Sequence, residues 1–249
     1  MDKAEEVTEA LLRKISGIPE KRSKTVLLGE ALAKMEDDLV LEVFRIILKK
    51  SEARIPRYQE GLSYITDIPE MVRRLGNAKL STVYTLSRER GYEEVTRLLR
   101  RIPPHRRSED SPDEVYQDVG LKDVALGMRK TLAKSTNMDL VNRLLHDQDH
   151  SVIQHILMNP FLTEDQVIRI ASKRPTSAEI LKAISKNNKW LSRYRIKRVL
   201  ILNPYTPTDV SIRLLRFMMT QDLVEISQDG SLHEELRSAT KDILHRKVD

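Results

Sequence analysis

The sequence predicts an all-α protein, and three observations lead to this prediction. Its apolar residues are mainly leucine, isoleucine, valine and alanine, which fill the interfaces between packed helices, and aromatic residues make up only 4% of the chain. Apolar and charged positions alternate with a period near 3.6, and no segment keeps the period of 2 that marks a strand. A ten-residue phrase that ends at Phe161 has a similar counterpart that ends at Tyr205, 44 residues later. These features indicate repeated helices without a sheet.

The composition excludes several kinds of site. The chain of 249 residues has no cysteine, so it can form neither a disulfide nor a thiolate metal site nor a cysteine nucleophile. No segment approaches the roughly 18 apolar residues that a membrane span needs, and the first residues do not resemble an export signal. The eight glycines form no phosphate-binding loop, dinucleotide fingerprint or nucleophile elbow. We therefore expect a cytoplasmic protein without a membrane span, a cofactor or a catalytic constellation.

Residues 1–101 are expected to form an irregular helical region. Helical spacing of apolar residues, interrupted by glycine and proline, predicts segments at residues 3–16, 20–35, 37–50, 58–66, 69–75, 79–90 and 92–101. The third segment starts with Asp37 and Asp38 and ends with Lys49 and Lys50, charges that complement the helix dipole at both ends.

Residues 102–118 interrupt the helical pattern. They contain Pro-Pro-His-Arg-Arg followed by Ser-Glu-Asp-Ser-Pro-Asp-Glu, a polar run with three prolines and few side chains to bury. This composition predicts a polar linker or a long exposed loop. Ser111 stands three residues before Glu114, the spacing of a capping box, so a short helix at this point is an alternative.

Residues 119–249 are expected to form a second, more regular helical domain. Its predicted helices span residues 121–134, 138–146, 151–158, 163–172, 176–185, 192–202, 207–218, 222–227 and 231–245. Three of these starts have the three-residue offset of a capping box, namely Thr163 with Gln166, Thr176 with Glu179 and Ser231 with Glu234.

The repeated phrase places Asn159-Pro160 and Asn203-Pro204 at equivalent positions. Proline lacks an amide donor and restricts the residue before it, so each Asn-Pro pair is expected to end a helix and form a corner between repeats. The asparagine side chain can bond to backbone groups left open at the helix end. A 44-residue unit with three short helices has the length and content of a HEAT or armadillo repeat.

At these corners the chain resembles bacterial HEAT-like and leucine-rich-repeat-variant α-solenoids, in which phrases such as Asn-Pro-Phe-Leu-Thr-Glu-Asp-Gln-Val recur. The resemblance covers roughly residues 121–244 and implies an α-solenoid, while it says little about chemistry. Only two copies of the phrase are clear, so an irregular helical bundle with one duplicated corner remains an alternative.

The positive charge concentrates in the second half of the chain. Residues 1–118 contain 22 basic and 22 acidic residues, which leaves 21 basic and 15 acidic residues in 119–249 and accounts for the net charge of +6. Between residues 166 and 208 the only acid is Glu179. The candidate binding residues of this basic segment are Arg169, Lys173, Arg174, Lys182, Lys186, Lys189, Trp190, Arg193, Tyr194, Arg195, Lys197 and Arg198.

Two interpretations of the basic segment stay open. Lys189, Arg193 and Lys197 are spaced four residues apart and would line one helix face if a helix began that early, and exposed Trp190 and Tyr194 could then stack on bases. Alternatively, the two aromatic side chains pack into the core and the charges face solvent.

A cluster of histidine and carboxylate residues follows the helix predicted at residues 138–146. It consists of His146, Asp147, Asp149, His150 and His155. The four-residue spacing of His146 and His150 occurs in metal sites. The intervening Asp-Gln-Asp has the composition of a turn with capping aspartates, however, and we expect this simpler role and no metal.

The sequence therefore favours a non-enzymatic scaffold or adaptor that docks an acidic protein partner on a basic solenoid surface. The alternative is a nucleic-acid-binding HEAT-like module, because some HEAT-like folds are DNA glycosylases. A deep cleft with a buried carboxylate facing Trp190, Tyr194 and the arginines would favour the second function.

Overall fold

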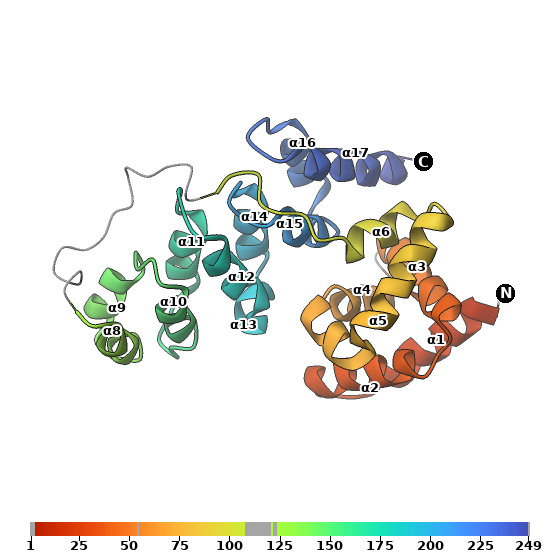
Figure 1. Cartoon of the computed structure of the whole chain (residues 1–249), viewed down its shortest axis with the longest axis horizontal. Coiled ribbons are helices and arrows are strands. Elements are labelled where there is room, and N and C mark those ends of the chain that lie inside the picture. The colour runs from red at the N-terminus through yellow and green to blue at the C-terminus, as the bar shows by residue number, and fades with distance from the viewer. Residues whose placement is uncertain (1–2, 54, 108–120, 122–123, 249) are drawn as a thin grey trace. The chain divides into compact units, whose positions relative to one another are not determined.

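The computed structural model describes residues 3–53, 55–107, 121 and 124–248, and across these ranges the regular secondary structure is helical (Figure 1). An isolated bridge joins Pro104 and Pro207. The expected all-α class is thus confirmed. The chain divides into two compact units, Met1–Arg101 and Ile102–Asp249. None of the helices in these ranges is both long enough and apolar enough to cross a membrane.

The first unit is built around its third helix. Its elements are α1 (Lys3–Ser16), α2 (Lys21–Ala33), α3 (Asp37–Glu52), α4 (Pro56–Ile65), α5 (Ile68–Glu89) and α6 (Glu93–Leu99). Helix α3 packs against α1, α4, α5 and α6, and buries an apolar side that includes Val43, Phe44 and Ile47. Its acidic first turn and basic last turn follow the charge pattern that the sequence shows.

Helix α5 contains the break that the sequence predicts between residues 75 and 79. Gly76 has φ 81° and ψ 157°, a non-helical conformation in which a residue with a side chain would be strained. The two expected helices are therefore nearly continuous and meet at this glycine. Asp67 starts the first of them by accepting a hydrogen bond from the Glu70 amide at 3.3 Å.

The second unit continues with shorter helices. They are α8 (Leu126–Leu132), α9 (Met138–Leu144), α10 (His150–Leu157), α11 (Glu164–Ser172), α12 (Ala178–Lys186), α13 (Asn188–Leu191), α14 (Tyr194–Leu202), α15 (Thr208–Leu215), α16 (Thr220–Gln228) and α17 (Glu234–Val248). The expected capping box at Thr163 and Gln166 is present. The one expected at Thr176 is wrong, because Ser177 caps α12 instead.

Helices that are not consecutive along the chain lie side by side in the second unit. Helix α10 packs against α8 and α12, and α11 packs against α14. In Figure 1 α11 lies above α10, and α14 lies above α12 and α13. Their buried side chains form one apolar core, to which Trp190, Leu200 and Leu215 contribute.

The segment before residue 108 is mostly exposed, as expected, but it is also attached to the second unit. Ile102 is only 7% exposed and belongs to the core of the second unit. The Pro103 carbonyl accepts hydrogen bonds from the amide and the hydroxyl of Thr208 at 3.4 and 2.7 Å, and the Arg106 amide donates to the Pro204 carbonyl at 3.1 Å. The buried side chain of Ile102 and the backbone hydrogen bonds of Pro103 and Arg106 therefore attach this polar stretch to the second unit. The capping box predicted at residues 111–114 lies outside the described residues.

Attachment of this segment is expected to weaken at acidic pH. The His105 ring meets that of His233 edge-on at 5.7 Å. Partial desolvation and the positive charges of His233, Arg106 and Arg237 lower the pKa of His105. His105 therefore binds a proton more readily when the segment is detached than when it is attached. The segment is held fully above about pH 6.5, and this attachment is lost as the pH falls towards the lowered pKa. Hydrogen exchange at the Thr208 amide should accelerate between pH 7.5 and 5.5 after correction for the intrinsic rate.

The matched variant for this experiment is His105→Gln, which cannot acquire the charge. Its exchange at Thr208 should depend much less on pH than exchange in the unmodified chain. Equal pH dependence in the two proteins would show that His105 does not control the attachment.

Candidate functional site

The two Asn-Pro corners share one hydrogen-bonding pattern. The Asn159 side-chain amide donates to the carbonyls of Ala133 and Ser135 at 3.0 and 2.9 Å, and its oxygen accepts from the Phe161 amide at 3.0 Å. Both carbonyls lie just after α8, which ends at Leu132 with Ala133 as its C-cap, in a turn where carbonyls need partners from outside the helix. The asparagine therefore joins its own corner to the end of a different helix.

The second corner repeats these contacts with other residues. The Asn203 side-chain amide donates to the carbonyls of Ala171 and Lys173 at 2.8 and 3.1 Å, and its oxygen accepts from the Tyr205 amide at 3.0 Å. Asn159 and Asn203 are 2% and 1% exposed, respectively. Their side chains thus fasten α10 to the end of α8 and α14 to the end of α11.

Trp190 lies in the core and is not an exposed stacking surface. It is 2% exposed, and its indole nitrogen donates to the Leu157 carbonyl at 2.9 Å. The ammonium of Lys189 lies 4.4 Å from the centre of the indole ring. The sequence left open whether Trp190 is exposed for stacking or packs into the core, and the structure places it in the core.

Tyr194 is held by a polar network between α14 and α16. Its hydroxyl donates to Asp222 and accepts from the Met219 amide. The other Asp222 oxygen accepts from Arg198 at 2.8 Å, and Arg198 also pairs with Glu225. Burial and the Asp222 hydrogen bond raise the pKa of Tyr194. Asp222 is thus a buried carboxylate near Tyr194, but both of its oxygens are engaged in a link between two helices.

Lys189, Arg193 and Lys197 do not share one helix face. Helix α13 ends at Leu191 and α14 begins at Tyr194, with Arg193 as its N-cap residue. The condition for a shared face, a helix that begins before Lys189 and continues through Lys197, is therefore not met. The separation arises because Asn187 caps a short helix that places Trp190 in the core.

Acidic residues from outside the basic segment meet its arginines. Arg193 pairs with Glu164 at 3.3 Å, and Arg195 pairs with Asp165 at 2.9 Å. Both acids start α11, which packs against α14. The basic segment itself contains almost no acids, but the fold brings acids to it, since Glu164 and Asp165 lie 29 and 30 residues before the arginines that they pair with. Both pairs are solvent-exposed, and such pairs contribute about 0–1 kcal/mol.

The other candidate cations have different environments. Lys182 pairs with Glu179 at 2.7 Å, Arg174 donates to the Leu202 carbonyl, and Lys197 lies 5.3 Å from the centre of the Phe217 ring. The exposed members of the predicted set are Arg169, Arg174, Lys186, Lys189, Arg193 and Arg195. We call these six side chains the exposed basic group.

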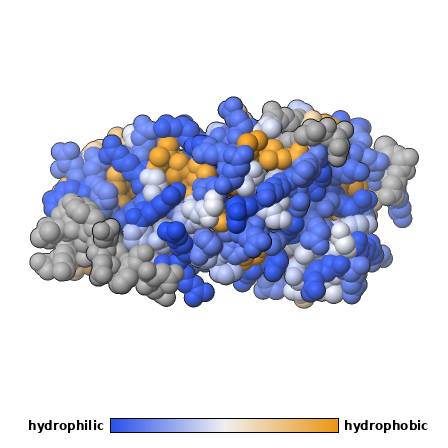
Figure 2. Space-filling model, turned by 90° about the horizontal axis from the view of Figure 1, so that it is seen from above, coloured by the Kyte–Doolittle hydropathy of each residue, from blue (hydrophilic) through white to orange (hydrophobic). Residues whose placement is uncertain are grey.

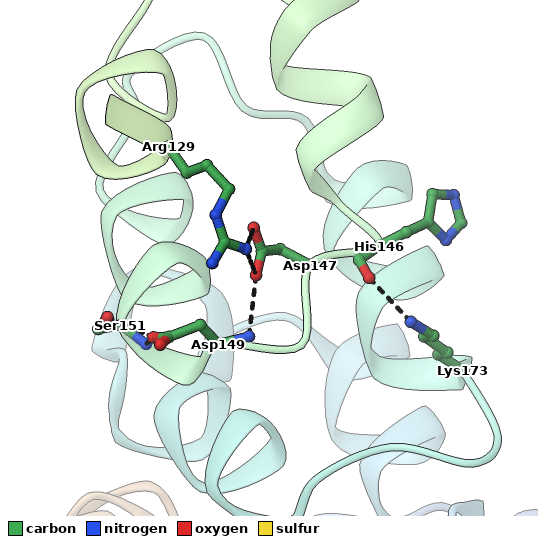
Figure 3. A network of polar contacts seen from close by, with 6 residues as sticks. All are labelled: Arg129, His146, Asp147, Asp149, Ser151 and Lys173. Atoms are coloured by element: carbon green, nitrogen blue, oxygen red, sulfur yellow. Dashed lines mark hydrogen bonds and ion pairs between the residues drawn. The ribbon is translucent and has the colours of Figure 1, made fainter. Parts of the chain in front are cut away.

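Lys173 does not belong to the exposed basic group. Its ammonium is partly buried and donates to the His146 carbonyl at 2.9 Å (Figure 3). Burial lowers the pKa of Lys173, while the charge of Asp147 opposes this shift. Lys173 is therefore an internal link between the end of α11 and the turn before α10.

The predicted His-carboxylate cluster is a turn whose carboxylates hold other groups. Both carboxylate oxygens of Asp147 accept from one terminal nitrogen of Arg129, and Asp147 also accepts from the Asp149 amide at 2.9 Å. Asp149 caps α10 through the Ser151 amide, and the imidazole of His146 points away from this network (Figure 3). In the described ranges no three histidine, cysteine, aspartate or glutamate side chains come together as metal ligands.

One surface feature has no counterpart among the predicted site residues. The face of the molecule in Figure 2 is largely hydrophilic, with smaller apolar areas between the charged side chains. Met158 and Phe161, on either side of Asn159-Pro160, are 79% and 56% exposed. Their position at a corner is a hint in the sequence, because apolar residues at a corner need not face the core. The sequence does not indicate which of these residues stay exposed.

Comparisons with models of protein families, with curated proteins and with solved structures find no match for this chain.

Proposed function

We propose that the second unit is a HEAT-like α-solenoid that serves as a non-enzymatic binding scaffold and docks an acidic protein partner through the exposed basic group. The packing of α10 on α8 and α12 and of α11 on α14, together with the repeated asparagine bonds after α8 and at the end of α11, supports a repeat architecture. Stacked repeats offer an extended surface, which suits a macromolecular partner.

One observation favours a protein over a single-stranded nucleic acid. Trp190 is buried and Tyr194 is partly buried against the apolar core, so these two rings offer little surface on which bases could stack. The cations themselves remain accessible. Because the exposed pairs of Arg193 and Arg195 are weak, carboxylates of a partner can replace Glu164 and Asp165 at little cost.

Reversing the charge of four members of the group is expected to abolish partner capture. The variant carries Lys186→Glu, Lys189→Glu, Arg193→Glu and Arg195→Glu. Crosslinked capture from a nuclease-treated native lysate should recover acidic proteins with the unmodified chain and lose them with this variant. Recovery should also fall as the salt concentration rises, because salt screens exposed charges.

A matched control reverses four exposed cations of the first unit, namely Lys14, Lys34, Arg73 and Arg88. It changes the net charge by the same amount and should retain the captured proteins. Binding to a DNA or RNA duplex, measured across a salt series, distinguishes this function from the alternative of a nucleic-acid-binding module. Duplex binding that the first reversal abolishes, without any acidic protein in the nuclease-treated capture, would favour the nucleic-acid module instead.

A further inference from the structure

The second Asn-Pro corner, residues 202–209, is occupied by another part of the chain. Ile102–Arg106 runs across it in an extended form (Figure 1, yellow-green segment beside α15). The corner donates from the Thr208 amide to the Pro103 carbonyl and from the Asp209 amide to the Ile102 carbonyl, both at 3.4 Å. In the other direction, the Arg106 amide donates to the Pro204 carbonyl of the corner at 3.1 Å. Tyr205, in the middle of this corner, is 4% exposed.

The amino-acid sequence of the bound segment suits these contacts. The first two amides of α15 have no acceptor within their own helix, and the carbonyls of Ile102 and Pro103 supply one to each. Pro103 and Pro104 have no amide hydrogen that would be left without an acceptor on the corner. Proline also restricts the free segment to extended conformations, so that less conformational entropy is lost when it is ordered.

The first Asn-Pro corner, residues 158–165, has the same construction but is open. Pro160, Phe161 and Thr163 are exposed there, whereas their counterparts Pro204, Tyr205 and Pro207 are buried. Within the described part of the chain, the Pro160 carbonyl and the amides of Glu164 and Asp165 have no hydrogen-bond partner. These are the three backbone groups that correspond to those engaged at the second corner.

We propose that the first corner binds an extended, proline-containing segment of a partner protein, with an apolar residue followed by two prolines, as in Ile102–Arg106. Phe161 and Met158 supply exposed apolar surface for the segment to cover. The site adjoins the exposed basic group, because Glu164 and Asp165 pair with Arg193 and Arg195. The backbone groups and the apolar surface that carry the proposal do not depend on the proposed role of that group.

The two corners differ in one bond of the duplicated pattern. Thr208 adds its hydroxyl to the Pro103 carbonyl at 2.7 Å, and Glu164 stands at the equivalent position in the first corner. A segment at the first corner therefore has one hydrogen bond fewer. This difference suits a partner that binds and leaves, in contrast to the segment at the second corner, which belongs to the same chain.

The test uses a capped synthetic peptide with the sequence of residues 101–107, Arg-Ile-Pro-Pro-His-Arg-Arg, titrated into the full chain. Amide resonances of Phe161, Glu164 and Asp165 should shift on binding. The uncharged change Phe161→Ala should weaken binding about tenfold, because truncating a covered aromatic anchor removes apolar contact. Replacing both prolines of the peptide with alanine should also weaken it.

The matched control is Val224→Ala, which truncates another exposed apolar side chain on α16. It should bind the peptide as the unmodified chain does. The proposal is overturned by absence of binding at millimolar peptide, by equal affinity of the Phe161→Ala variant, or by shifts at Thr208 and Asp209 alone, which would mean exchange at the second corner. Concentration-dependent dimerisation that Phe161→Ala abolishes would identify a second copy as the occupant and would also overturn it.

Discussion

Replacing Trp190 with alanine is expected to destabilise the second unit by about 3–5 kcal/mol, the usual effect of removing a large buried aromatic side chain. Trp190 is 2% exposed and belongs to the apolar core, so the change leaves a cavity between α13 and its neighbours. It also removes the donor to the Leu157 carbonyl at 2.9 Å. The midpoint of thermal unfolding should fall by roughly 10 °C for a unit of this size.

The measurement is far-ultraviolet circular dichroism, because Trp190 is the only tryptophan and its fluorescence is lost in the variant. Phe161→Ala is the comparison, since it removes an aromatic ring that is 56% exposed. Its midpoint should stay close to that of the unmodified chain, because exposed positions usually change stability by about 0.5 kcal/mol or less. Similar midpoints for both variants would contradict the structural role of Trp190.

Asn203→Ala is expected to cost about 3 kcal/mol. It removes both donors to the carbonyls of Ala171 and Lys173 and the acceptor of the Tyr205 amide, in a site that is 1% exposed. Each buried polar group that loses its partner costs about 1–3 kcal/mol, and partial rearrangement reduces the sum. Chemical unfolding followed by circular dichroism measures the change in the free energy of unfolding.

Asn203→Asp separates hydrogen bonding from packing. The aspartate has nearly the same shape and keeps the acceptor, but it places an oxygen against two carbonyl oxygens. It should therefore be at least as unstable as the alanine variant. Asn188→Ala, at an exposed position of α13, is the control and should change the free energy of unfolding by about 0.5 kcal/mol or less. A stable Asn203→Asp variant would show that the two carbonyl bonds contribute little.

Local features of the sequence predict helices well where the signals lie within one turn. The first helix has the predicted bounds, residues 3–16, and the capping box of Thr163 with Gln166 forms as its spacing indicates. At the start of α12 the same spacing misleads. Thr176 is buried, and Ser177 takes the cap by accepting from the Glu179 amide at 3.2 Å. The spacing of residue types does not say which of two neighbouring hydroxyl groups faces the helix end.

The candidate binding surface was predicted only in part. The excess of positive charge between residues 166 and 208 is visible in the sequence, and six of its side chains are exposed. The pairing of Arg193 with Glu164 and of Arg195 with Asp165 is not visible, because each pair joins the start of α11 to the start of α14, three helices later. Helical periodicity describes each helix by itself and does not say which helix lies beside it.

The sequence by itself determined the all-α class and the two Asn-Pro corners, because helix periodicity and the restrictions of proline act on neighbouring residues. Only the tertiary structure decided that Asn159 and Asn203 bond to a different helix, that Trp190 is buried, and that Ile102–Arg106 covers one corner while the other stays open. These outcomes depend on which segments meet in space. Burial and hydrogen bonding between distant segments select among arrangements that local sequence leaves equally acceptable.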